Sequence, residues 1–216
     1  MMEAVALREH QEKALEKAEA VIRSGGLVAV PTDTVYGIIG DALLPEAVAR
    51  LYALKQRPKE KAFPVFVKDI AMARRFAYIS DAKAGFLEHV WPGSVTVVFH
   101  RKEKLPLELT AGMDTIALRM PNAPFLLALL ARVDVPLAQS SANLSGMPSA
   151  VHGQDVIAAF AREKQKPDLV IDGGAVPGTP SAIIDLTANE PRLVRSGLMS
   201  KKELDALFVR LQGAME

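Results

Sequence analysis

Short apolar runs alternate along this chain with longer segments whose apolar residues recur at helical spacing. Short apolar or β-branched runs between turn residues are typical of buried strands. The longer segments gather their apolar side chains on one face, as helices that cover a sheet do. Because several strands also follow one another late in the chain, the pattern predicts a twisted, mixed parallel and antiparallel α/β sheet with helices on its faces.

The boundaries of these elements follow from their turn and cap residues. Gly25 and Gly26 close the first helix, Pro58 stops the second, and Ser200 with Glu203 forms a capping box for the last. Strands are expected at 27–30, 64–67, 94–100, 115–119, 136–140, 168–172, 181–186 and 192–195. Helices are expected over 10–24, 45–57, 80–89, 123–133 and after residue 200, and 101–112 and 144–154 are expected to be exposed loops.

Length and composition set the class of protein. The chain has 216 residues, half of them hydrophobic, and a net charge of +1, which is the balance of a globular protein. Because no linker or low-complexity tract interrupts the pattern, we expect a single domain over 1–216.

Two absences from the sequence restrict chemistry and location. The chain has no Cys, which excludes disulfides, a thiol nucleophile and thiolate metal sites. Its N-terminal segment is charged, without an apolar run of signal-peptide type, and no stretch approaches the length that spans a bilayer. We therefore expect a cytoplasmic location and no membrane partner.

The common nucleotide and metal motifs are also missing. Neither GxxxxGK[ST] nor GxGxxG occurs, so an ATP site in this chain is neither a Walker loop nor an ordinary dinucleotide fold. The four His residues show no metal-binding spacing and no HExxH. We expect no metal site formed by the protein itself.

Two hydroxyl-rich segments each follow an expected strand. They are PTDTVYG at 31–37 and SSANLSG at 140–146. Loops at the ends of strands are where α/β sheets bind ligands, and hydroxyls, amides and backbone N–H groups bind phosphate or ribose oxygens. Each segment is equally compatible with a hydrogen-bonded turn. From the residue types alone, both interpretations stay open.

Basic residues concentrate in the second quarter of the chain. Residues 50–75 hold eight Lys or Arg against Glu60 and Asp69, a local net charge of +6. Such a cluster attracts phosphates, although cations at the end of a helix are also ordinary solvated residues. Arg119 ends an otherwise apolar strand, where it is suited to bind a carboxylate or to form a structural ion pair.

The order of the motifs is more specific than any one of them. PTDTVYG, KxRP, WPGSVTVVF, ALRMPN, SSANLSG and LVRSG follow one another between about Gly25 and Gly197. Together they resemble the YrdC-like threonylcarbamoyl-AMP synthase family, in its short single-domain form, which implies no additional C-terminal domain. The resemblance implies a YrdC-like fold around a positively lined cavity. The sequence departs from the family pattern at two positions, Ala62 and Ala182. These differences concern the local shape of the loops.

The resemblance also implies roles for individual residues. The KxR and SxN elements correspond to a catalytic set of Lys55, Arg57, Ser141 and Asn143. Positions that bind L-threonine in the family correspond to Thr34, Phe66, Arg119, Gln139 and Ser181. Positions that bind ATP correspond to Arg57, Lys61, Thr115, Ser141, Ser149 and Arg195.

The implied activity is the synthesis of threonylcarbamoyl-AMP from L-threonine, bicarbonate or CO2, and ATP, with release of pyrophosphate. ATP is a substrate, and Mg2+ is expected on its phosphates. The product is the first intermediate of the t6A modification of tRNA. A threonylcarbamoyl transferase machinery is therefore the expected recipient, and tRNA is a candidate contact.

Two other functions remain open. The basic segment 50–75 also suits a module that binds double-stranded RNA or tRNA without catalysis. A related domain that transfers a carbamoyl group from carbamoyl phosphate is the second alternative. The RNA module leaves the hydroxyl-rich loops unexplained, and carbamoyl-transfer domains normally form part of much larger proteins.

Overall fold

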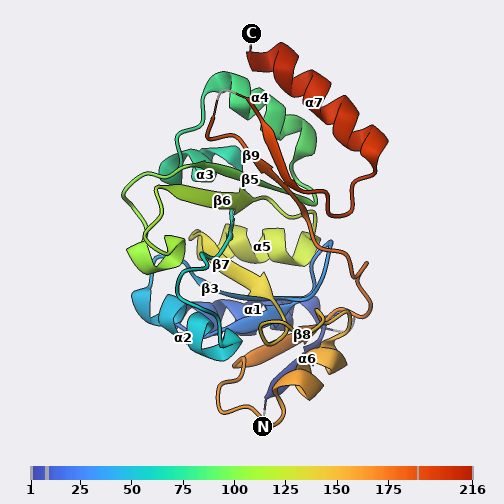
Figure 1. Ribbon diagram of the computed structural model, residues 1–216. Coiled ribbons are helices and arrows are strands. Elements are labelled where there is room, and N and C mark those ends of the chain that lie inside the picture. The colour runs from blue at the N-terminus through green and yellow to red at the C-terminus, as the bar shows by residue number, and fades with distance from the viewer. Residues whose placement is uncertain (1, 8–9, 189, 216) are drawn as a thin grey trace.

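The computed structural model describes residues 2–7, 10–188 and 190–215, which form a single ten-stranded sheet with helices on both faces (Figure 1). Its strands are β1 (Glu3–Ala6), β2 (Val28–Val30), β3 (Gly37–Asp41), β4 (Val65–Phe66), β5 (Val95–His100), β6 (Thr115–Arg119), β7 (Leu137–Ser141), β8 (Leu169–Asp172), β9 (Ala182–Asp185) and β10 (Arg192–Arg195). They lie side by side in the order β1-β8-β2-β3-β7-β4-β6-β5-β9-β10.

Parallel and antiparallel pairs alternate irregularly across this sheet. The pairs β1–β8, β2–β8, β4–β6 and β5–β9 are parallel. The pairs β2–β3, β3–β7, β4–β7, β5–β6 and β9–β10 are antiparallel. The prediction of a mixed α/β sheet is confirmed.

The helices form two layers of unequal extent. They are α1 (Gln11–Arg23), α2 (Pro45–Lys55), α3 (Ile70–Phe76), α4 (Asp81–Val90), α5 (Pro124–Val133), α6 (Gly153–Phe160) and α7 (Lys201–Met215), with a 3-10 turn, η1 (Leu107–Thr110). Apolar residues of α1 and α5 share one core cluster with alternate residues of β2 and β8, while the other helices contribute to a second cluster. Val28 and Val30 face the first cluster and Ala29 the second, so β2 is buried on both faces.

The layer of α1 and α5 covers only part of its face of the sheet. Its core cluster includes residues of β1, β2, β3, β7 and β8. Further along the sheet, Val98, Ala117 and Ile183 of β5, β6 and β9 are partly exposed. Their neighbours Val97 and Leu118 point the opposite way and are fully buried. This partly uncovered face is where the cavity described below lies.

Several sequence-based expectations need correction. The strands β1 and β3 and the helices α3 and α6 were not predicted. The segment 101–112 is not a fully exposed loop, because it contains η1 and the buried Leu105 and Leu109. The segment 144–154 is likewise partly buried, at Ala150 and at Gly153, where α6 begins.

Candidate active site

A cavity of about 420 Å³ lies over the partly uncovered face of β5, β6 and β9. Alternate residues of the strands form its floor, and the loops before β3, β4 and β9 form its walls. Of the residues expected from the sequence to bind substrates, those in its lining are Thr34, Arg57, Arg119, Gln139, Ser141, Ser149, Ser181 and Arg195. Segments far apart in sequence therefore meet in one cavity.

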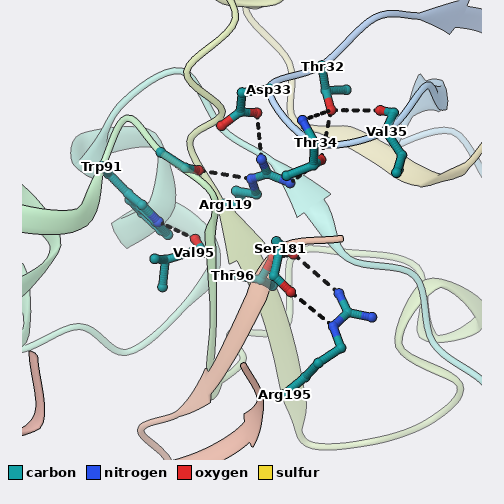
Figure 2. Close-up of polar contacts among 11 residues, drawn as sticks. Thr32, Asp33, Thr34, Val35, Trp91, Val95, Thr96, Arg119, Ser181 and Arg195 are labelled. Carbon is teal, nitrogen blue, oxygen red and sulfur yellow. Dashed lines mark hydrogen bonds and ion pairs between the residues drawn. The ribbon is translucent and has the colours of Figure 1, made fainter. Parts of the chain in front are cut away.

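Arg119 is the most deeply buried cation in the cavity lining, with 2% of its surface exposed. Its guanidinium pairs with the carboxylate of Asp33 and donates to the backbone oxygen of Gly93 at 2.9 Å and to Thr34 Oγ1 at 3.2 Å (Figure 2). These contacts use three of its five N–H groups. The two that remain can bind a carboxylate from the cavity.

The hydroxyls of Thr96, on β5, and of Ser181, directly before β9, lie next to each other. Ser181 Oγ lies 2.9 Å from Thr96 Oγ1, and Arg195 Nε donates to the Ser181 backbone oxygen at 2.9 Å (Figure 2). The Arg195 side chain is on the edge strand β10 and is exposed. Although the residue is exposed overall, its guanidinium is partly shielded from water where it meets Ser181; this desolvation lowers the pKa of Arg195, and the positive charge of Arg119 lowers it further. The two guanidinium groups thus face the same cavity.

Lys55 lies behind the cavity wall rather than in it. It is 2% exposed, and its Nζ donates to Ser141 O at 2.6 Å, to Asn143 Oδ1 at 2.9 Å and to Asn143 O. Burial, with the charge of Arg57 added, lowers its pKa to about 7. Three acceptors around Nζ nevertheless match the three hydrogens of an ammonium, so the geometry is that of the protonated amine.

Ser141 and Asn143 complete this cluster. Ser141 Oγ donates to Asn143 Oδ1, and Asn143 Nδ2 donates to the backbone oxygens of Leu144 and Met147. Lys55 and Asn143 both hydrogen-bond to Ser141, and Ser141 lines the cavity. Lys55 therefore acts on the cavity only by positioning Ser141. The catalytic role that the resemblance implies for Lys55 stays a prediction.

Arg57 lines the cavity from the loop that precedes β4. It donates to the backbone oxygens of Lys61 and Ala62, each at 2.9 Å, and its guanidinium lies 4.9 Å from the centre of the Phe63 ring. These contacts fix the planar group at its position. Its remaining N–H groups are available to an anion in the cavity.

Some expected site residues lie outside the cavity lining. Lys61 is exposed and contributes its backbone oxygen to Arg57. Thr115 begins β6, on the same face of the strand as Ala117 and Arg119. Phe66 is buried, with its ring 5.8 Å from the Arg119 guanidinium.

The sequence did not single out three residues that support the site. Thr32 contacts Thr34, Asp33 pairs with Arg119, and Thr96 contacts Ser181. The first two lie within the PTDTVYG motif, and Thr96 points to the cavity face of the strand SVTVVFH. Among the residues that the structure describes, no cluster of His, Asp or Glu could hold a metal ion.

The fold and this cavity together indicate the class of protein to which the chain belongs. Guanidinium groups and hydroxyls gather over one face of a mixed α/β sheet, as expected of a protein that binds a small anionic ligand. The family model Sua5_yciO_yrdC, described as "Telomere recombination", matches residues 20–197. The chain belongs to this Sua5/YciO/YrdC family, which confirms the resemblance.

Individual relatives agree with this assignment. The threonylcarbamoyl-AMP synthase of Pyrococcus abyssi is 35% identical over 92% of this chain, and that of Bacillus subtilis is 33% identical over 90%. A crystal structure of P. abyssi Sua5 in complex with L-threonine matches with a TM-score of 0.88 and 33% identity, over 96% of this chain and 60% of that one. The chain spans 58% and 56% of the length of the two synthases.

No helix among the described residues combines the length and apolar character needed to cross a membrane.

Proposed function

We propose that this chain forms threonylcarbamoyl-AMP from L-threonine, bicarbonate and ATP. The observation that carries the proposal is one cavity in which a buried Arg119, framed by hydroxyls, faces the separate cations Arg57 and Arg195. Such a cavity suits two anionic substrates that must react with each other. Relatives at 33–35% identity are named threonylcarbamoyl-AMP synthases, and one solved relative is in complex with L-threonine.

Arg119 is proposed to bind the carboxylate of L-threonine through its two free N–H groups. Thr34 and Ser181 lie beside it and offer hydroxyls to the polar end of the amino acid. Gln139 lines the same cavity, and Phe66 supports the guanidinium from below. The carboxylate would therefore be fixed before the amine reacts.

Arg57 and Arg195 are proposed to bind the phosphates of ATP. Ser141 and Ser149 line the same cavity and offer hydroxyls to the nucleotide. Lys61 and Thr115 lie outside the lining, and their proposed contact with ATP rests on the family resemblance. The acidic residues near the cavity do not form a metal-binding group within the described chain. Mg2+ would accordingly be held by the phosphate oxygens of ATP and would shield their charge.

The proposed reaction has two steps. Bicarbonate loses hydroxide to give CO2, to which the neutral amine of L-threonine adds; the proton that the amine loses combines with the hydroxide to give water, and a carbamate is left. A carbamate oxygen then attacks the α-phosphorus of ATP, and the bond to the β-phosphate breaks with release of pyrophosphate. Both reactants of the second step are anions, so the main work of Arg57 and Arg195 is to offset their repulsion. Positioning in one cavity supplies a further part of the acceleration.

The test is pyrophosphate release from ATP and Mg2+, with L-threonine and bicarbonate supplied together and singly. Release that requires both substrates is expected. Release with carbamoyl phosphate in place of bicarbonate and L-threonine would favour a carbamoyl transferase. RNA binding with a steep salt dependence and no turnover would favour the RNA module, for which the comparisons give no support.

A further inference from the structure

The hydroxyl of Thr32 is buried behind the cavity wall and has three partners. Its residue is 5% exposed, and its Oγ1 donates to the backbone oxygen of Val35 at 2.7 Å. The same oxygen accepts from the backbone N–H of Thr34 at 3.0 Å and lies 2.9 Å from Thr34 Oγ1 (Figure 2). Thr32 itself does not line the cavity, whereas Thr34 does.

These contacts decide which hydroxyl donates. A hydroxyl has one hydrogen and two lone pairs. The Thr32 hydrogen is used on Val35 O, because a carbonyl oxygen can only accept. The hydrogen between the two hydroxyls must then come from Thr34. One lone pair of Thr32 takes that hydrogen and the other takes the Thr34 backbone N–H.

The second hydroxyl is thereby left with one function. Thr34 Oγ1 gives its only hydrogen to Thr32 and uses one lone pair to accept from Arg119 Nη1. A single lone pair remains for a ligand in the cavity. Thr34 can therefore accept a hydrogen bond from a ligand and cannot donate one.

We propose that Thr32 is a positioning residue that fixes the Thr34 hydroxyl as an acceptor and so selects ligands with an N–H or O–H group beside their carboxylate. The inference rests on the proposed amino-acid site and deepens it. A carboxylate or phosphate oxygen placed at Thr34 would meet a lone pair, while Arg119 next to it offers two free N–H groups. Arg119 and Thr34 thus orient an amino acid in one direction, with its carboxylate on Arg119 and a donor group on Thr34.

The test is calorimetric binding of L-threonine and of L-2-aminobutyrate, which lacks the hydroxyl, to the purified chain. Thr32→Val keeps the shape of the side chain but frees the Thr34 hydrogen. We expect it to weaken L-threonine binding about 3- to 10-fold, the effect of one neutral hydrogen bond. Thr32→Ser retains the oxygen and should bind like wild type. On a Thr34→Val background, Thr32→Val should cause no further loss, because it acts through that hydroxyl.

A matched control removes a comparable hydroxyl elsewhere. Thr110 is buried and its Oγ1 donates to the Leu107 backbone oxygen, outside the cavity lining. Thr110→Val should lower the melting temperature and leave both affinities unchanged. ATP affinity should be unchanged in Thr32→Val.

Every outcome is informative. If Thr32→Val loses affinity for L-threonine alone, the inference is supported and the ligand hydroxyl is the donor to Thr34. If it loses affinity equally for both amino acids, the inference is supported and the amine is the donor. Unchanged affinity in Thr32→Val, the same loss on the Thr34→Val background, or weak binding by Thr32→Ser would overturn it. Should the valine variant not fold, Thr32→Ala takes its place, with the same loss expected and with unchanged affinity overturning the inference. A wild-type chain that binds neither amino acid would overturn the proposed function itself.

Discussion

The two sides of the cavity hold their cations in opposite ways. On the amino-acid side, Arg119 is buried and fixed by Asp33, Thr34 and Gly93. On the phosphate side, Arg57 is half-buried and Arg195 is exposed. A buried, fully positioned cation recognises one ligand geometry, whereas exposed cations attract any polyanion and are screened by salt. Selectivity is therefore expected to come from the first side and attraction of the nucleotide from the second.

The largest effect is expected from Arg119→Met. It leaves the charge of Asp33 buried without its partner, which costs about 3–5 kcal/mol of folding free energy, and it removes the carboxylate contact. Chemical denaturation and L-threonine calorimetry measure the two losses. Asp33→Asn added to Arg119→Met should restore part of the stability and none of the binding. A single variant as stable as wild type would show that the pair is not buried in solution.

Lys55→Met is expected to destabilise by about 3 kcal/mol, because three buried oxygen acceptors lose their donor. Although Lys55 lies in a charged segment of the sequence, it is buried, so loss of its side chain is expected to affect the fold. Lys61→Met is the control, since Lys61 is exposed in the same basic segment and its loss should change stability by less than about 0.5 kcal/mol. Equal melting temperatures for the two variants would contradict the three buried hydrogen bonds described for Lys55.

Arg57→Ala is expected to slow pyrophosphate release about a hundredfold, as loss of one positioned charge in a transition state does. Arg57→Lys should recover only part of this, because the Lys ammonium is a point charge and lacks the planar array of N–H groups that contacts the Lys61 and Ala62 backbone oxygens. Lys59→Ala, an exposed neighbour outside the cavity lining, is the control and should leave the rate unchanged. Near-normal release by Arg57→Ala would remove the residue from the reaction.

Substrate preference sharpens the comparison further. L-Serine keeps every polar contact and loses one methyl group, a penalty of roughly 1–3 kcal/mol. L-Valine loses the hydroxyl and leaves a polar group of Thr34 or Ser181 unpaired, so its penalty should be larger. Pyrophosphate release at matched concentrations should fall in the order threonine, serine, valine. Valine ahead of serine would mean that the cavity recognises shape alone.

The smallest effect is expected from Arg195→Ala. An exposed ionic contact contributes at most about 1 kcal/mol, or roughly fivefold in ATP affinity, and L-threonine affinity should hardly change. The loss should shrink as salt is added, because the contact is screened. Titrations of both ligands at low and high salt test this, and a greater loss for L-threonine than for ATP would reverse the assignment of the two sides.

Local patterns in the sequence predicted most of the fold. The run LVAV predicts β2 because each of its residues is apolar and the strand is buried on both faces. The strand β3 escaped prediction because Gly37 and Gly40 interrupt its apolar residues. A Cβ at position 40 would lie 2.7 Å from a methyl group of Leu27, so a larger residue there would force that buried side chain to shift.

Most residues of the cavity lining that are assigned to substrates could be predicted from the sequence, whereas the contacts among the site residues could not. Lys55 lies in a charged segment, and its burial depends on acceptors 86 and 88 positions away in Ser141 and Asn143. The partner of Arg119 is likewise 86 positions away, at Asp33. Spacing within a motif carries no information on such pairs, because only the packing of the sheet brings them together.

The most direct measurement is mass spectrometry of the product after incubation of the chain with ATP, Mg2+, L-threonine and 13C-labelled bicarbonate. The expected product carries the mass of AMP joined to threonine through one carbonyl, with one labelled carbon. It should be absent when either L-threonine or bicarbonate is omitted and strongly reduced with Arg57→Ala. Conversion of ATP without a labelled adduct, or no conversion by a folded chain that binds both ligands, would contradict the proposed synthesis.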